Sequence, residues 1–136
     1  MWRSDDRWVD AVARSLVSQV ALAVPPGVEM GFEGDRSVRL RLASQPPGEA
    51  VFDFALIANQ PGHGTRIQNA ATAVSAFLNF LQDFLILYTR EPWPNPSRPL
   101  DNPSVTVRGR VIEGWFGEDP EASDALRVSV EVPDER

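Results

Sequence analysis

The hydrophobic residues at the start of the chain recur at three- and four-residue steps. This spacing places them on one face of an α-helix and predicts a helix over residues 4–24. Ser4 is a suitable N-cap, and the two aspartates that follow it favour the positive end of a helix dipole. The Pro-Pro-Gly sequence at 25–27 ends the helix. Its predicted core positions are Trp8, Val9, Val12, Leu16, Val20 and Ala23.

Alternation of apolar and polar residues then predicts three β-strands, over residues 28–32, 38–42 and 50–57. Short turn-forming sequences separate these strands, so we expect them to pair antiparallel. Further along, the same alternation predicts two more strands, over residues 105–112 and 126–132. Arginines and acidic residues share the polar face of these strands, and we expect them to form cross-strand charge pairs.

The longest predicted element is a helix over residues 66–89, with a wide apolar stripe. Its remaining face has one charged residue, whereas a solvated helix face usually carries several, so we expect part of that face to be covered. The residues of this polar face are Gln68, Asn69, Thr72, Ser75, Asn79, Gln82 and Asp83. These polar residues also interrupt the apolar run, which favours a core helix over a membrane span.

The order of these elements predicts one α+β domain over residues 1–136. We expect helix, three strands, long helix and two strands to form a two-layer sandwich, in which both helices cover the apolar face of a five-stranded antiparallel sheet. With 136 residues, 43% of them hydrophobic, the chain is long enough to bury a core without metal or disulfide support.

Composition excludes several kinds of chemistry. The chain has no cysteine, which rules out disulfides, thiolate metal sites and a cysteine nucleophile. It has no lysine, because all 13 basic residues are arginines, and so it lacks Schiff-base and P-loop lysine chemistry. A net charge of -6 argues against nucleic-acid binding and favours a basic partner surface. The acidic residues near the start do not fit a signal peptide, so we expect a cytoplasmic protein.

One loop before the long helix is a candidate anion or ligand site, formed by His63, Gly64, Thr65 and Arg66. Helix N-termini present unpaired amide groups to anions, and His63 can carry a proton. The plain alternative is a turn before a capped helix. With a single histidine and no G-x-S-x-G sequence, we find no catalytic or metal-binding constellation, and we expect no enzyme activity and no cofactor.

Aromatic residues in predicted loops are candidate partner contacts, because tryptophan anchors are enriched in protein interfaces. Alternatively, they fold back and cap the ends of the core. The candidate partner surface combines these aromatic residues with the polar helix face: Asn69, Thr72, Asn79, Asp83, Trp93, Trp115 and Phe116.

The element order, small size and acidity resemble the type III secretion chaperone fold over nearly the whole chain, without a shared residue motif. This resemblance implies a homodimeric, non-enzymatic protein that holds an extended segment of a partner. Our leading hypothesis is therefore a protein-binding module, using the long helix, sheet edges or loop aromatics. The alternatives are a small-molecule-binding protein or enzyme with a pocket near residues 59–66, and a structural subunit of a larger assembly.

Overall fold

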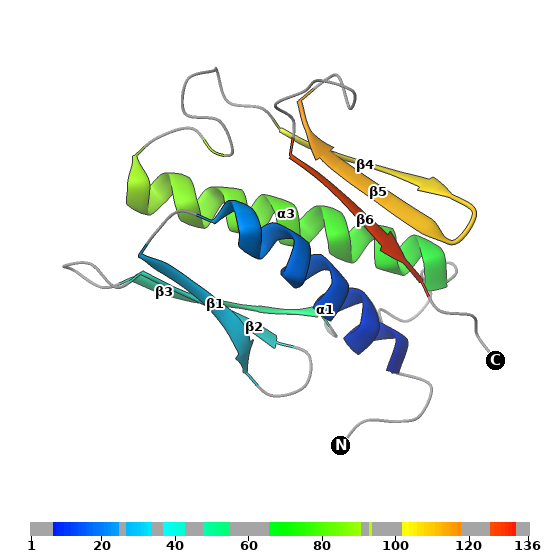
Figure 1. The fold of residues 1–136 in the computed structure, drawn as a ribbon, viewed down its shortest axis with the longest axis horizontal. Coiled ribbons are helices and arrows are strands. Elements are labelled where there is room, and N and C mark those ends of the chain that lie inside the picture. The colour runs from blue at the N-terminus through cyan, green and yellow to red at the C-terminus, as the bar shows by residue number, and fades with distance from the viewer. Residues whose placement is uncertain are drawn as a thin grey trace.

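The computed structural model describes residues 7–24, 27–33, 37–42, 48–54, 66–90, 93, 102–117 and 126–132. Within these ranges the chain forms an α+β fold with two α-helices, one short 3₁₀ helix and six strands (Figure 1). In chain order they are α1 (Arg7–Val20), η2 (Ala21–Ala23), β1 (Val28–Glu33), β2 (Ser37–Leu42), β3 (Gly48–Asp53), α3 (Arg66–Thr89), β4 (Pro103–Arg108), β5 (Val111–Phe116) and β6 (Arg127–Glu131).

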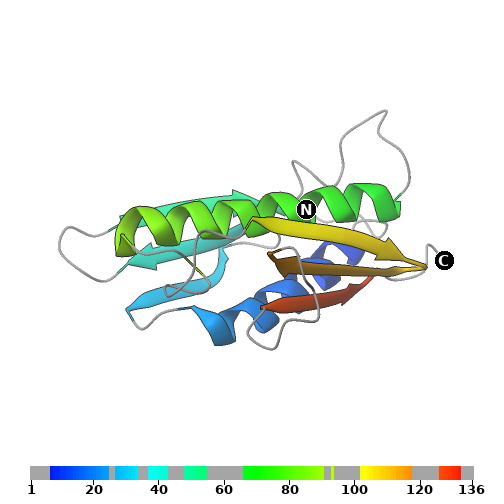
Figure 2. The same ribbon diagram turned by 90° about the horizontal axis from the view of Figure 1, so that it is seen from above.

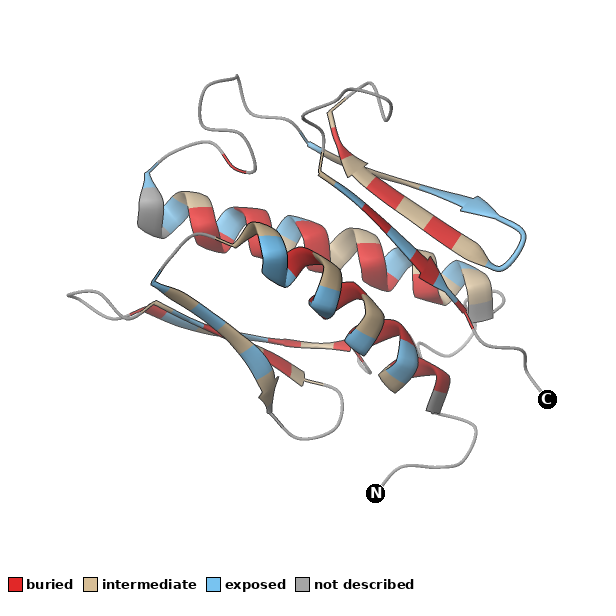
Figure 3. Ribbon diagram, in the orientation of Figure 1, coloured by how far each residue is buried: buried red, intermediate tan, exposed pale blue. Residues whose placement is uncertain are grey.

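The strands form two separate antiparallel sheets, so the prediction of a single five-stranded sheet is wrong. Sheet A has the order β1-β2-β3, and sheet B has the order β4-β5-β6. β5 and β6 alternate between buried and more exposed residues, as Figure 3 shows, whereas β4 does not alternate and its Val107, predicted to face the core, is exposed. The alternation therefore indicated the core-facing side of β1, β2, β3 and β6, but it contains no information about which strands share a sheet.

The predicted strand 105–112 is in fact two strands joined by a tight turn at Gly109 and Arg110. Gly109 has a φ of 64°, the left-handed value that the first central residue of a type II′ hairpin turn requires. Apolar residues on both sides of the turn continue the alternation, which concealed the hairpin. In consequence, Trp115 and Phe116 lie within β5 and not in a loop.

The third predicted strand also differs at its ends from the prediction of residues 50–57. β3 begins at Gly48 and ends at Asp53, and Phe54 is already helical. Phe52 and Phe54 nevertheless both reach the core, with ring centroids 4.9 Å apart. Phe52 lies in a strand and Phe54 is helical, yet both face the core. The alternation of the sequence therefore does not show where the strand ends.

The helices lie between the two sheets, which makes three layers where the sequence predicted two (Figures 1 and 2). On one side of α3, the ring of Phe77 packs against Phe52 and Phe54 of sheet A, with centroids 5.4 and 5.2 Å away. On the other side, Leu78 packs against sheet B at Gly114, where an added Cβ would lie 3.0 Å from the leucine Cδ1 atom. The wide apolar stripe of α3 thus serves two sheets.

Trp93 fills the space between the C-terminal end of the α1–η2 segment, α3 and sheet B. Its side chain is 5% exposed, its Nε1 donates to the Ala23 carbonyl oxygen at 3.2 Å, and its ring meets Phe116 edge-on at 5.2 Å. Gln82 of α3 is also buried and donates from Nε2 to the Trp93 carbonyl oxygen at 3.0 Å. This confirms that part of the polar face of α3 is covered.

One described helix segment, Ile67–Leu87, has the length and hydropathy of a membrane span. Half of that segment is buried inside the fold, and buried core helices meet the same criteria. Within it, Phe77 packs against Phe52 of sheet A and Leu78 against Gly114 of sheet B.

Candidate partner-binding edge

Three of the four edge strands contact a helix of the middle layer. In sheet B, β6 packs against α1 and β4 packs against α3. At β6 the contact is specific, because the Gln19 carboxamide is hydrogen-bonded to both backbone groups of Ser129. In sheet A, β3 contacts α3. The Gln19 carboxamide occupies a position beside β6 that a further strand would take, and covering an edge in this way keeps a sheet from pairing with other chains.

Strand β1, the other edge of sheet A, differs from these three. Among the described elements, its extensive contacts are with β2 alone. The two strands pair in continuous register from Val28 opposite Leu42 to Glu33 opposite Ser37, so no bulge interrupts the edge. β1 contains no proline, and Val28, Met30 and Phe32 place no charge on its core-facing side. A regular six-residue edge strand of this kind can pair with another strand.

The core-facing side of β1 is only partly covered. Val28, Met30 and Phe32 are half-buried and pack against the margin of the core. The Arg14 guanidinium of α1 lies over the Phe32 ring, 4.6 Å from its centroid. An additional strand beside β1 would therefore extend an apolar layer that ends at this edge.

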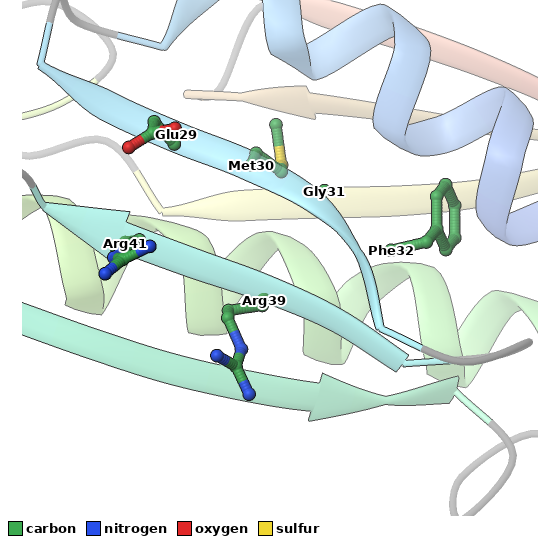
Figure 4. Close-up of a pocket in the computed structure, with 6 residues that line it drawn as sticks. All are labelled: Glu29, Met30, Gly31, Phe32, Arg39 and Arg41. Atoms are coloured by element: carbon green, nitrogen blue, oxygen red, sulfur yellow. The ribbon is translucent and has the colours of Figure 1, made fainter.

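The outer side of β1 and β2 contains a shallow depression of about 340 Å³, lined by Glu29, Met30, Gly31, Phe32, Arg39 and Arg41 (Figure 4). Gly31 has no side chain to fill this depression, and an added Cβ there would meet nothing within 4 Å. We call this open space the gap at Gly31. Arg39 extends towards β3, where its Nη1 lies 3.2 Å from Glu49 Oε1. Arg41 lies opposite Glu29 in the register and makes no ion pair or hydrogen bond with the described residues.

The cross-strand charge pairs that the sequence predicted occur in both sheets. Arg39 pairs with Glu49 in sheet A, and Arg108 Nε lies 3.4 Å from Glu113 Oε1 in sheet B. All four side chains are substantially exposed, so these pairs keep the outer faces soluble more than they stabilise the fold.

The predicted polar face of α3 is split by the structure. Thr72, Asn79 and Asp83 are exposed, whereas Asn69 is half-buried. Thr72 and Asn79 donate hydrogen bonds to carbonyl oxygens of their own helix. This narrow stripe is exposed to solvent, and it does not line the depression at β1.

Of the three aromatic residues predicted to lie in loops, two are part of the core, as the alternative interpretation had it. Trp93 and Phe116 are buried against each other in the core, so neither is part of an exposed partner surface. Trp115 lies on the outer side of β5, half-buried, between Ser104 of β4 and Arg127 of β6 in the register. Its Nε1 is buried without a hydrogen-bond partner.

The candidate ligand loop lies almost entirely outside the described residues. His63, Gly64 and Thr65 are not described, and of Arg66 the structure describes only its place as the first residue of α3. Among the described residues, no group of three or more histidine, cysteine, aspartate or glutamate side chains is placed to hold a metal ion. A second depression, of about 570 Å³, lies beside Gln19, Leu22, Ala23, Leu126 and Arg127, and Leu22 is 91% exposed there.

Comparison of the chain with protein-family models, curated proteins and solved structures finds no match. The resemblance to type III secretion chaperones therefore stays a prediction. The uncovered edge at β1 was not singled out in the sequence analysis. The alternation shows which face of a strand is buried, but not whether a helix covers its edge.

Proposed function

We propose that this protein is a non-catalytic protein-binding module that binds an extended segment of a partner by β-strand addition at β1. The observation that carries the proposal is the contrast between edges. β3, β4 and β6 each contact a helix, and Gln19 occupies the edge of β6, whereas β1 is a regular edge strand with extensive contacts to β2 alone among the described elements. Natural sheets usually protect their edges, so an unprotected regular edge favours a binding role.

In this proposal, backbone hydrogen bonds supply much of the affinity and alternating side chains supply the selectivity. Apolar residues of the added strand would continue the layer of Val28, Met30 and Phe32. Its polar residues would lie on the outer side, beside the depression at Gly31. An acidic residue opposite Gly31 would lie near Arg39 and Arg41, which favours an apolar–acidic–apolar partner sequence.

The partner of this proposal is a protein, as the sequence analysis predicted, but the basic partner surface expected from net charge is revised. The chain as a whole is acidic, with a net charge of -6. The depression at β1, however, has two arginines and one glutamate among its lining residues. Salt screens exposed charges that are far apart, so the charged side chains nearest to a bound strand affect it most. The residues that line the depression therefore matter more for the fit of a strand than the net charge of the whole chain. Cytoplasmic location and the absence of a cofactor remain predictions.

The proposal is tested by selecting displayed random peptides on the protein immobilised at low density, so that copies cannot pair. The matched variants are Met30→Lys, which places a charge on the core-facing side of the edge, and Val51→Lys, on the outer side of β3, where Val51 is 47% exposed. We expect alternating apolar–polar peptides that bind the native protein and Val51→Lys but not Met30→Lys, with backbone NMR shifts at Glu29–Phe32. Binding unaffected by Met30→Lys would contradict the proposal.

A further inference from the structure

We infer that the strand accepted at β1 is β1 of a second copy, so that two molecules form a homodimer with a continuous six-stranded sheet. This inference rests on the proposed strand addition at β1. It commits to one register, in which Met30 of one copy lies opposite Met30 of the other. The register follows from the faces of β1, its charges and the gap at Gly31.

The first restriction is the alternation of faces. In a two-fold antiparallel pair, a register centred between two residues would place core-facing residues opposite outer ones and break the apolar layer. A register centred on a residue keeps Val28, Met30 and Phe32 on the core-facing side of both copies. The pairing must therefore be centred on one residue of β1.

Charge and overlap then select among these centres. Centring on Glu29 places two glutamates opposite each other, and centring on Gly31 places Glu29 opposite Glu33. Like charges at directly opposed positions are destabilising. Centring on Phe32 pairs only residues 31–33 of the strand. Centring on Met30 pairs residues 28–32 of both copies and opposes no like charges.

The Met30 register also uses the gap on the outer side. It places Glu29 of each copy opposite Gly31 of the other, where no side chain occupies the space. One row across the dimer then reads Arg41, Glu29, Gly31 of the second copy and Arg39 of the second copy. Adjacent strands are about 4.8 Å apart, so an arginine can reach a glutamate across a glycine. Each Glu29 thus lies between two arginines.

On the core-facing side, the same register pairs Val28 with Phe32 and Met30 with Met30. These side chains are half-buried in the single molecule and would be covered further by the second copy. The same alignment therefore covers apolar side chains on one side of the sheet and places each Glu29 near arginines on the other side. A strand from an unrelated protein would need an apolar–acidic–apolar pattern, which β1 itself provides as Val28-Glu29-Met30.

The register is tested by single-cysteine scanning, which is clean because the chain has no cysteine of its own. The variants are Glu29→Cys, Met30→Cys and Gly31→Cys, each followed for disulfide-linked dimer under mild oxidation. Only Met30→Cys brings its own sulfur opposite itself, so we expect it to cross-link more than about tenfold faster than the other two. Faster linkage through Glu29→Cys or Gly31→Cys would overturn the Met30 register.

Solution mass by light scattering separates failure of this inference from failure of the proposed function. We expect a dimer for the native chain and for Val51→Lys, and a monomer for Met30→Lys. A native monomer that still binds selected peptides at β1 would overturn the second copy as occupant and leave the proposed function standing. A dimer that withstands Met30→Lys but is lost in Asn79→Arg would place the interface on α3 and overturn the inference. The proposed function would then be decided separately, by the peptide-binding assay.

Discussion

Gln19 pairs with Ser129 as a neighbouring β-strand would. Its Nε2 donates to the Ser129 carbonyl oxygen at 2.8 Å, and the Ser129 backbone N–H donates to Gln19 Oε1 at 2.9 Å. A side-chain amide has the same donor and acceptor as a peptide group, so it can occupy one position of a strand edge. Ser15, one turn earlier on α1, accepts from the same Nε2 and holds the carboxamide in place.

Replacing Gln19 with methionine should therefore destabilise the fold. The substitution keeps the size of the side chain but leaves both Ser129 backbone groups without this partner. We expect the free energy of unfolding to fall by about 1–3 kcal/mol, measured by urea denaturation. Ser18→Ala is the control, because the exposed Ser18 hydroxyl bonds only its own helix, at Ser15. Equal losses in both variants would show that the Ser129 pairing contributes no stability.

Gly31→Val should have opposite effects on the single molecule and on the dimer. Its side chain meets open space, and valine suits a strand better than glycine, so the monomeric Met30→Lys background should gain about 0.5–1 kcal/mol. In the native background, the valine fills the gap between Glu29 and Arg39 of the two copies. Because two such pairs are affected, dimerisation should weaken about tenfold in sedimentation experiments. Unchanged dimerisation would argue against charge contacts across Gly31.

Gln82→Leu should cost stability although it makes a buried position more apolar. Gln82 is 3% exposed, and its Nε2 donates to the carbonyl oxygen of Trp93. Leucine would leave that carbonyl without this donor, at an expected loss of about 1–3 kcal/mol in chemical denaturation. Asn79→Leu is the matched control, because Asn79 is exposed and bonds only its own helix, at Ser75. A stabilised Gln82→Leu variant would contradict the importance of the Trp93 contact.

Trp115→Phe should be tolerated unusually well for a tryptophan substitution. The indole Nε1 is buried without a hydrogen-bond partner, and such a group costs about 1–3 kcal/mol. Phenylalanine removes that cost while it keeps an aromatic ring on β5. We expect the free energy of unfolding to change by less than about 1 kcal/mol, whereas Trp93→Phe, which loses the bond to Ala23, should lose more. A larger loss at Trp115 than at Trp93 would reverse this argument.

Much of the local structure was predictable because periodicity reports burial directly. Steps of three and four residues located α1 and α3, and alternation located the buried faces of the strands of sheet A and of β6 in sheet B. Alternation did not reveal the turn at Gly109, since a tight turn between apolar residues leaves the pattern nearly unchanged. The start of α3 at Arg66 was predicted, but the loop before it lies outside the described residues.

The sequence by itself determined the α+β class, the course of the helices and the face that β1, β2, β3 and β6 bury. Only the tertiary structure decided that the strands form two sheets with α3 between them, that Trp93 and Phe116 belong to the core, and that β1 is the edge strand with no extensive helix contact among the described elements. The reason is physical: burial is a property of each residue and leaves a local periodic signal, whereas edge cover depends on distant pairs such as Gln19 and Ser129.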